Sequence, residues 1–524
     1  LRGGGQHLPA MKAPPAEESP FRAAYVAIRR LKRAVFLKDP AVDFDQLLLV
    51  DTPFPMRWVP ESPYNKRYPE SPFVFCNEWN HQSHHRNGFN ALSGSRLLLL
   101  SGLHPGGEVR MLAPGQGQGD GAILRPDLSF DGKRLLFSYK AEDEMNYHLY
   151  EMNVDGTGLR QLTFGNYDDN DPVYLPDGHI LFASTRGNTY VRCMHYSHCT
   201  TLCRCDADGG NVYLISQNSE PDWLPSLMAD GRILFTRWEY SDKTVMRNQG
   251  LWTTNPDGTG TQVFWGSQSV WPDNLSYPRQ IPGSAKVMFD GAGHHCIFNG
   301  SVGIVDPQKG REYPDGLAKV TPDVQFEEVG DGPASLPPAS KEYHAAGKFL
   351  SYKFACPLSD SLFLVSAIRG EPTKSYKNSY SFRFAGKFAL YLMDVDGNKE
   401  LVYNGEHNCF YAVPLKPRQP PPVVASSVQW PGTGQDRQPP KPGSFYSNDV
   451  YEGTAIPRGE AKHLRVVSMD YRTYTTWFSS FYLGGSKPVP QISGTSLDAV
   501  KTVLGTVPVE ADGSFYFTAP AGQQ

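Results

Sequence analysis

The sequence has no apolar run that approaches the ~18 residues of a membrane-spanning helix, so we expect no transmembrane segment. It also lacks an excess of one charge, because 50 Lys and Arg residues against 54 Asp and Glu residues leave a net charge of −4. A balanced charge gives no electrostatic footprint for nucleic acid, and we expect no such partner. The chain begins with Leu1 and has no apolar signal-peptide core, so we expect a piece of a longer or processed protein.

Several catalytic and cofactor motifs are also missing. The sequence has no G-x-S-x-G, no H-E-x-x-H and no C-x-x-C-H. These absences exclude the nucleophile elbow of a serine hydrolase, a zincin-type metal site and a c-type haem attached within these 524 residues. The eight cysteines are unevenly spaced, which fits neither a small disulfide scaffold nor a zinc ribbon.

Asp-Gly turns between apolar runs recur along most of the chain. In the clearest unit, Ser129–Gly165, one turn precedes Leu135–Phe137 and a second follows the run from His148 to Val154. Such turns signal hairpins, because glycine takes the positive φ that a tight turn requires. The Asp of the second turn recurs at positions 155, 208, 257 and 306, with spacings of 53, 49 and 49 residues, and Pro307 replaces the glycine in the last copy. A period near 50 with several strands per unit is typical of a β-propeller.

We therefore predict an all-β fold with a six-bladed propeller and a partial β-rich domain after it. The expected parts are a tail and helix at 1–42, the propeller at 43–425, a Pro-rich linker at 426–442 and the partial domain at 443–524. Apolar residues at helical spacing place the helix from Phe21 to about Lys38. The run Asp43–Val50 is expected to close the propeller ring. In the last domain, residues 503–509 and 514–518 are expected to form a hairpin at Asp512-Gly513.

The densest group of potential metal ligands lies between residues 193 and 205. Thiolates and imidazoles at this spacing bind zinc or copper, and the candidate ligands are Cys193, His195, His198 and Cys199. The same segment runs into a predicted strand, Thr201–Asp206, in which alternation places Leu202 on one face and Cys203 and Cys205 on the other. The alternatives to a metal site are inert core thiols or a disulfide between neighbouring strands.

A second candidate is His294-His295-Cys296, which follows the predicted strand Val287–Asp290. Two imidazoles and a thiol in a Gly-flanked turn can approach a metal or a cofactor closely, and ordinary loop histidines are the alternative.

Two further groups have weaker signals. The acidic stretch Asn166–Asp171 offers oxygen donors for calcium, but such clusters more often make turns. The side chains of Arg186, Arg192 and Arg237 follow strand ends, where they can face the axial channel or bind an anion.

The blade motifs resemble those of TolB-type six-bladed propellers, in LSFDGKRLLFSY, YEMNVDGTGLRQLTFG and DPVYLPDGHILFASTR. A narrower resemblance is carried by PSLMADGRILFTRWEYSD, IPGSAKVMFDGAGHH, GSVGIVDP and the terminal LGTVPVEADGSFYFTAPAG. These segments, in this order, are similar to the α subunit of hydrazine synthase and its relatives, from about residue 40 to the end of the chain.

The narrower resemblance implies a redox protein. In that family a propeller and a middle domain precede c-type haem modules with C-x-x-C-H sites, with zinc near one haem, and the enzyme makes hydrazine in an assembly with other cytochrome subunits. It implies that haem c and zinc belong to the full-length protein, that other protein subunits are partners and that the compartment is extracytoplasmic. The alternative function is a TolB-like propeller that binds a protein or a small ligand without catalysis. On the redox hypothesis, His294, His295 and Cys296 are expected to lie toward a haem or metal.

Overall fold

The computed structural model describes most of the chain, with the following residues placed: 20–53, 94–113, 120–141, 144, 146–191, 198–239, 248–269, 271–293, 296–326, 337–344, 349–370, 387–430, 432, 437–469 and 500–523. The chain divides into a small unit, Leu1–Asp43, and a large unit, Phe44–Gln524. In the small unit, helix α1 (Pro20–Phe36) lies where the apolar spacing predicts it.

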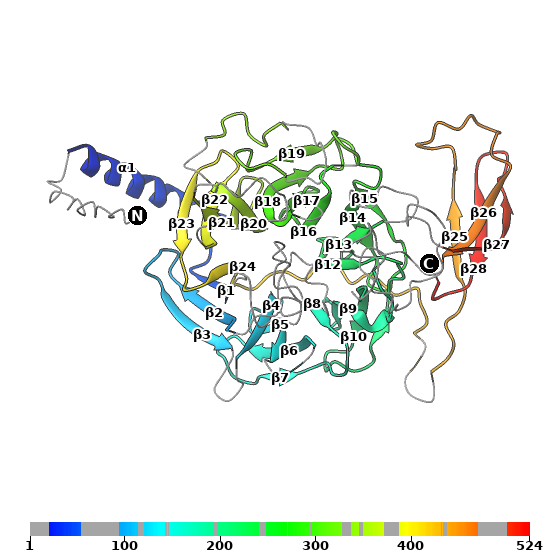
Figure 1. The fold of residues 1–524 in the computed structure, drawn as a ribbon, viewed down its shortest axis with the longest axis horizontal. Coiled ribbons are helices and arrows are strands. Elements are labelled where there is room, and N and C mark those ends of the chain that lie inside the picture. Colours follow the sequence, from blue (N-terminus) through cyan, green and yellow to red (C-terminus); the bar gives the residue numbers. More distant parts are fainter. Residues whose placement is uncertain are drawn as a thin grey trace, which may run out of the picture. The chain divides into compact units, whose positions relative to one another are not determined.

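The large unit contains six groups of four antiparallel strands, which lie around a common axis as the blades of a propeller (Figure 1). A single parallel bridge, between Gln249 and Asn274, joins the fourth and fifth groups into one eight-stranded sheet. In the description below, the strand given first for each blade is the one next to the axis. The first three blades consist, from the axis outward, of β24 (Asn408–Pro414), β1 (Gln46–Thr52), β2 (Arg96–Ser101) and β3 (Glu108–Ala113); β4 (Gly121–Leu128), β5 (Arg134–Ala141), β6 (His148–Asn153) and β7 (Arg160–Gln161); and β8 (Asp169–Tyr174), β9 (Ile180–Ser184), β10 (Thr201–Cys205) and β11 (Tyr213–Leu214).

The other three blades have the same order. They consist of β12 (Asp222–Leu227), β13 (Ile233–Trp238), β14 (Gln249–Thr254) and β15 (Gln262–Trp265); β16 (Asn274–Gln280), β17 (Val287–Gly293), β18 (Cys296–Val305) and β19 (Leu317–Lys319); and β20 (Phe349–Pro357), β21 (Leu362–Arg369), β22 (Ala389–Asp394) and β23 (Lys399–Tyr403). The predicted all-β, six-bladed fold is confirmed.

The ring is closed by pairing between the two ends of the propeller sequence. Strand β1 pairs antiparallel with β24, from Leu47 opposite Pro414 to Thr52 opposite Asn408, and with β2 on its other side. The blade thus combines one strand from the end of the propeller with three from its start. The prediction that the run after Asp43 closes the ring is confirmed.

The hydrophobic core lies between neighbouring blades. Successive residues of a strand point to opposite faces, so each blade contributes to two core layers. In the third blade, Leu202 packs with Phe235 of the fourth, whereas Cys203 and Cys205 pack with Leu149 of the second. The predicted alternation in this strand is confirmed.

The repeated Asp-Gly turns fix both the hairpins and the distance between blades. The carboxylate of Asp208 accepts a hydrogen bond from the Gly210 amide, and Gly209 has a φ of +86°. A Cβ at Gly209 would overlap the backbone carbonyl of Leu162 in the preceding blade, and one at Gly258 would overlap that of Ile215. Glycine is required at these two turns because the neighbouring backbone occupies the space of a side chain.

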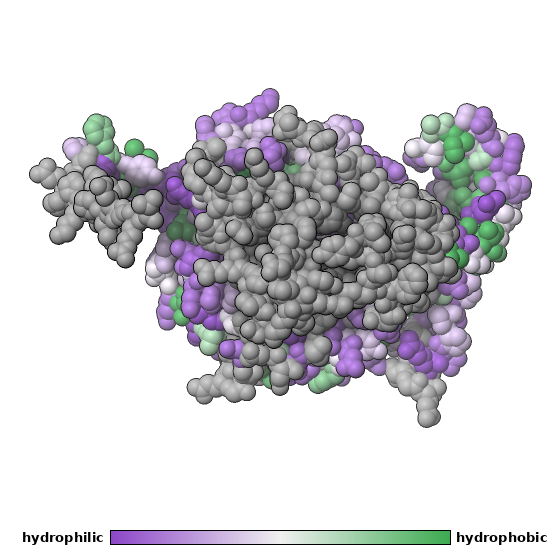
Figure 2. All heavy atoms as spheres, in the orientation of Figure 1, coloured by the Kyte–Doolittle hydropathy of each residue, from purple (hydrophilic) through white to green (hydrophobic). Residues whose placement is uncertain are grey.

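The last part of the chain forms two two-stranded sheets. Strand β25 (Gly443–Ser447) pairs with β28 (Phe515–Ala519), and β26 (His463–Met469) pairs with β27 (Lys501–Pro508). The turn at Asp512-Gly513 is present, but the predicted hairpin is wrong, because its two arms pair with different earlier strands. A turn signal acts over a few residues and does not select the strand partners. Figure 2 shows apolar residues on the surface of these strands, and Phe445, Val503 and Leu504 are exposed there.

We expect Gly209→Ala to destabilise the propeller more than Gly178→Ala. Both glycines have a φ near +90°, so each substitution carries the ~1–2 kcal/mol cost of a left-handed alanine. A Cβ at Gly178 meets no atom within 4 Å, whereas at Gly209 it adds the overlap with Leu162, which costs about another 1–3 kcal/mol. Urea unfolding of both variants measures the difference, and equal losses would contradict this account of blade spacing.

Candidate functional site

The axis of the propeller is filled by one residue from the innermost strand of each blade. All six innermost strands have a break in register at the same place, a two-residue bulge. The first bulge residues are 5% exposed or less, and they are Arg125, Asp171, Leu224, Tyr277, Phe354 and Tyr411. All except Arg125 have a φ between 51° and 57°. We call these six residues the axial plug.

Aromatic contacts join the plug across blades. The ring centroid of Phe354 lies 4.7 Å from that of Tyr277 and 4.4 Å from that of Tyr411. The hydroxyls of Tyr277 and Tyr411 are 3.2 Å apart, and the Arg125 guanidinium lies 5.8 Å from the centre of the Tyr277 ring. The left-handed conformations cost about 1–3 kcal/mol each, and the packing of these rings maintains them.

Neighbouring blades satisfy the backbone groups that the bulges release from pairing. The carboxylate of Asp290 accepts hydrogen bonds from the amides of Phe354 and Ala355, at 2.6 and 3.3 Å. The carboxylate of Asp127 accepts one from the Tyr174 amide, and the Ser226 hydroxyl donates to the Pro278 carbonyl. The bulges of the fifth and sixth blades are therefore held by a side chain of the preceding blade.

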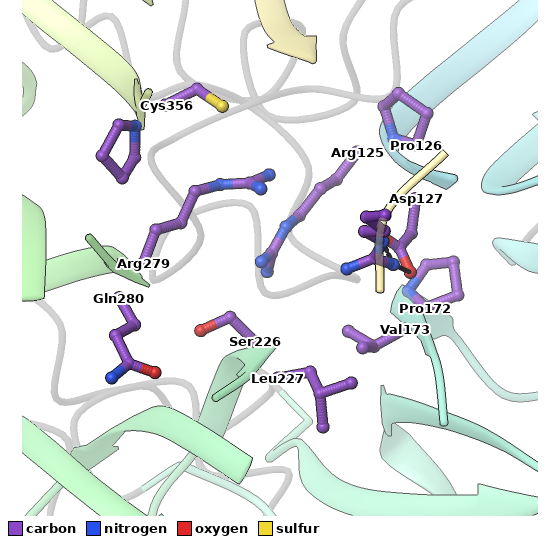
Figure 3. A pocket seen from close by; sticks show the side chains of 12 residues that line it. Arg125, Pro126, Asp127, Pro172, Val173, Ser226, Leu227, Arg279, Gln280 and Cys356 are labelled. Carbon is purple, nitrogen blue, oxygen red and sulfur yellow. Dashed lines mark hydrogen bonds and ion pairs between the residues drawn. The ribbon is translucent and has the colours of Figure 1, made fainter. Parts of the chain in front are cut away.

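A pocket of about 160 Å³ lies on one side of the plug (Figure 3). Its walls are the residues that follow the plug positions in five blades, together with Arg418 from the segment after β24. The lining residues are Arg125, Pro126, Asp127, Pro172, Val173, Ser226, Leu227, Arg279, Gln280, Cys356, Pro357 and Arg418. Because Arg125 is buried and Arg279 and Gln280 are half-exposed, the pocket has a buried end and an open end.

Three arginines and one aspartate give the pocket lining a positive charge. Arg418 bonds both carboxylate oxygens of Asp127 at 3.2 Å, so that pair is neutral. Figure 3 shows the side chains of Arg125 and Arg279 extending into the same pocket from different blades. Burial, with a further contribution from the charge of Arg279, lowers the pKa of Arg125, whereas the charge of Asp171 raises it. The Arg125 Nη1 atom is buried without a hydrogen-bond partner.

Two of the arginines singled out in the sequence have a structural role. The guanidinium of Arg186 bonds Asp169 at 2.7 Å, and that of Arg237 bonds Asp222 at 2.8 Å, in the same position of neighbouring blades. Arg237 also lies 4.9 Å from the centre of the Trp252 ring. Their charges are compensated within their own blades, so we no longer expect an anion there. Arg192 lies outside the described residues.

The acidic stretch Asn166–Asp171 forms internal contacts. Asp168 accepts a hydrogen bond from the Tyr147 amide, Asp169 pairs with Arg186, and Asp171 belongs to the plug. The described residues contain no group of three or more His, Cys, Asp or Glu side chains that can hold a metal ion. The carboxylates of this stretch, which were candidates for calcium ligands, instead stabilise the third blade through a hydrogen bond and an ion pair.

The first metal candidate is described only in part. Cys193 and His195 lie outside the described residues. Cys199 is buried, and the ring of His198 contacts that of Tyr190 in a tilted arrangement, with centroids 4.5 Å apart. Cys203 and Cys205 are buried free thiols, which agrees with the core-thiol alternative.

The second candidate lies at the corresponding position of another blade. His294 and His295 fall outside the described residues, and Cys296 begins β18, with its side chain also undescribed. Both candidates lie between the second and third strands of their blades, β9 and β10 in one case and β17 and β18 in the other. The second strands of these two blades, β9 and β17, occupy equivalent places in the ring.

The chain is thus an all-β protein with a six-bladed propeller and a second β-rich part. Residues 459–524 match the family model described as the hydrazine synthase alpha subunit middle domain, which confirms the resemblance predicted from the sequence. No curated protein sequence matches the chain.

The chain is similar to several solved structures, and the first of these has the same fold. Hydrazine synthase from Kuenenia stuttgartiensis is 17% identical, with a TM-score of 0.65, and the match covers 92% of this chain and 65% of that one. The chain therefore spans about two thirds of the length of that protein. TolB from Acinetobacter baumannii is 13% identical, with a TM-score of 0.41 and coverage of 75% of this chain and 72% of that one. TolB from Agrobacterium tumefaciens is 14% identical, with a TM-score of 0.36 and coverage of 56% and 84%.

We expect Asp222→Asn to destabilise the protein by about 3–5 kcal/mol. The substitution removes the negative charge that compensates the largely buried guanidinium of Arg237. The matched control is Asp360→Asn, which breaks the exposed pair with Lys286 and is expected to cost at most ~1 kcal/mol. Urea unfolding at neutral pH measures both, and a loss for Asp222→Asn as small as the control's would contradict a structural role.

We expect Cys203 to react with iodoacetamide only after unfolding. Burial raises the pKa of its thiol to about 12, so the reactive thiolate is scarce at pH 8 and the sulfur is also covered. The raised pKa stabilises the fold below the pKa of an unfolded thiol, and this contribution is lost as the pH rises from there toward 12. Mass spectrometry of protein labelled with and without urea tests this, and rapid labelling of native Cys203 would contradict it.

Proposed function

We propose that this chain is the propeller scaffold and part of the middle domain of a redox protein related to the hydrazine synthase α subunit. The observation that carries the proposal is the match of residues 459–524 to the middle-domain family model. It is supported by the common fold, which extends over 92% of the chain. A propeller followed directly by this middle domain is the order that the family resemblance implies.

The residues present do not fit a c-type haem. The 524-residue sequence has no C-x-x-C-H motif for haem attachment. The residues that the structure describes contain no group of three or more His, Cys, Asp or Glu side chains that could hold a metal ion. We therefore assign no chemical step to this chain. Haem c and zinc, in this proposal, belong to other parts of the full-length protein, and the propeller provides a rigid support for them.

The proposal includes a face of the propeller for contact with the redox centre. Two groups of metal candidates each follow the second strand of a blade. One group is His198 and Cys199, and the other is the triplet His294-His295-Cys296, so the segments that carry them begin on the same face of the propeller. We propose that this face is directed toward a haem or metal. Other protein subunits are proposed partners, and an extracytoplasmic compartment is the proposed location. The described residues include no helix that is both long and apolar enough to cross a membrane.

A second candidate function is a binding propeller without catalysis. The pocket beside the plug, which we call the axial pocket, favours this second function. It has an open end and contains the buried Arg125 guanidinium, whose Nη1 atom has no hydrogen-bond partner, and a ligand could supply that partner. The two functions are separable, since one concerns a cofactor carried elsewhere and the other a ligand in this chain.

The first test is an absorption spectrum of the full-length gene product, made in a host that attaches c-type haem. The redox proposal predicts a Soret band and covalently bound haem in the full-length protein. The 524-residue chain alone, which lacks an attachment motif, is the control and is expected to show neither. A full-length protein without covalent haem would contradict the proposal and leave the binding propeller.

A further inference from the structure

We propose that the axial pocket binds a small oxyanion, of the carboxylate or phosphate type, between the guanidinium groups of Arg125 and Arg279. This inference goes beyond the proposed redox role and does not depend on it. It rests on the charges, the burial and the size of the pocket.

The charges at the pocket are incompletely compensated. Arg418 is neutralised by Asp127, and the charge of Asp171, the acidic residue of the plug, acts on Arg125. Deeper in the ring, Asp290 and Lys353 compensate each other, with Nζ and the carboxylate oxygen 3.8 Å apart. Among the described residues, no carboxylate forms an ion pair with Arg125 or Arg279. Arg418 and Lys353 are positively charged, and Asp127, Asp171 and Asp290 are negatively charged. Together with Arg125 and Arg279, these groups have a net charge of one positive unit.

The position of Arg125 is costly without a ligand. Arg125 is 4% exposed, its Nη1 atom has no hydrogen-bond partner, and a second arginine, Arg279, extends into the same pocket. A buried, unpaired charge is strongly unfavourable, and two like charges add repulsion. An anion between them would supply the missing acceptor and cancel the repulsion.

The chemistry of arginine indicates the class of anion. A guanidinium presents parallel N–H donors that match the two oxygens of a carboxylate or two oxygens of a phosphate. The pocket volume of about 160 Å³ is close to that of a cavity that holds one benzene molecule, so the ligand has only a few heavy atoms. The half-exposed side chains of Arg279 and Gln280 leave an entrance for it from solvent.

The test is binding of inorganic phosphate and of succinate to the 524-residue chain, by calorimetry and by thermal unfolding at constant ionic strength with chloride as the reference. We expect saturable binding of at least one of the two and a concentration-dependent rise in Tm. Arg279→Gln is expected to weaken binding tenfold or more, because it removes charge-assisted hydrogen bonds. The matched control, Arg437→Gln, removes the same charge from an exposed site and is expected to bind as the wild type does.

A second measurement separates a site from a general charge effect. Without phosphate or succinate, Arg279→Gln is expected to have a Tm equal to or above that of the wild type, because it relieves the repulsion with Arg125. If Arg279→Gln does not fold, Arg279→Lys keeps the charge without the planar fork and is expected to bind at least severalfold more weakly. No response beyond that to chloride, or equal binding by the Arg279 and Arg437 variants, would overturn the proposal. Neither result bears on the haem spectrum.

Discussion

The pairing of β1 with β24 is the interaction on which the rest of the structure depends. A propeller blade alone has two exposed edges and two uncovered faces, and the ring removes the uncovered faces only if the last blade meets the first. Here one blade is shared by both ends of the propeller sequence, so residues near 50 and near 410 are fixed side by side. Closure also fixes how near the six innermost strands come to the axis. The bulges, the plug and the pocket follow from that distance.

Crowding at the axis explains why the innermost strands are irregular. In a regular strand, side chains point to the two faces of a blade, and none points along the sheet to the axis. A two-residue bulge rotates one residue out of this alternation and into the centre. The cost is strain at Leu224, Tyr277 and Phe354, which adopt left-handed backbone conformations that such residues rarely adopt. This strain is offset by packing at the axis, where aromatic rings of different blades contact one another instead of leaving a void.

The sequence predicts those features that depend on a few consecutive residues. Asp-Gly turns are local, because the Asp side chain caps its own turn and glycine supplies the positive φ, so their spacing revealed the blades. The strand Thr201–Cys205 was likewise predictable from alternation. The partners of Arg186 and Arg237 were within reach of sequence reasoning, since Asp169 and Asp222 occupy equivalent places in two repeats. The pocket was not, because Arg125, Arg279 and Arg418 are distant in sequence and meet only after closure. The plug was hidden for a different reason: local preferences argue against a left-handed Leu or Phe.

The arrangement of charges distinguishes the two ends of the axis. At the start of the innermost strands, Asp169 pairs with Arg186, which follows the next strand of its blade, and Asp222 pairs with Arg237 of the next strand. These pairs connect strands that every blade must join, and they need nothing from outside the protein. At the other end of the same strands, beyond the plug, Arg125 and Arg279 come from different blades and line one pocket, and no carboxylate among the described residues forms an ion pair with either of them. A charge pattern that only stabilised the ring would resemble the first end at both ends. The unpaired arginines therefore mark the second end as a place where a partner from solution completes the structure.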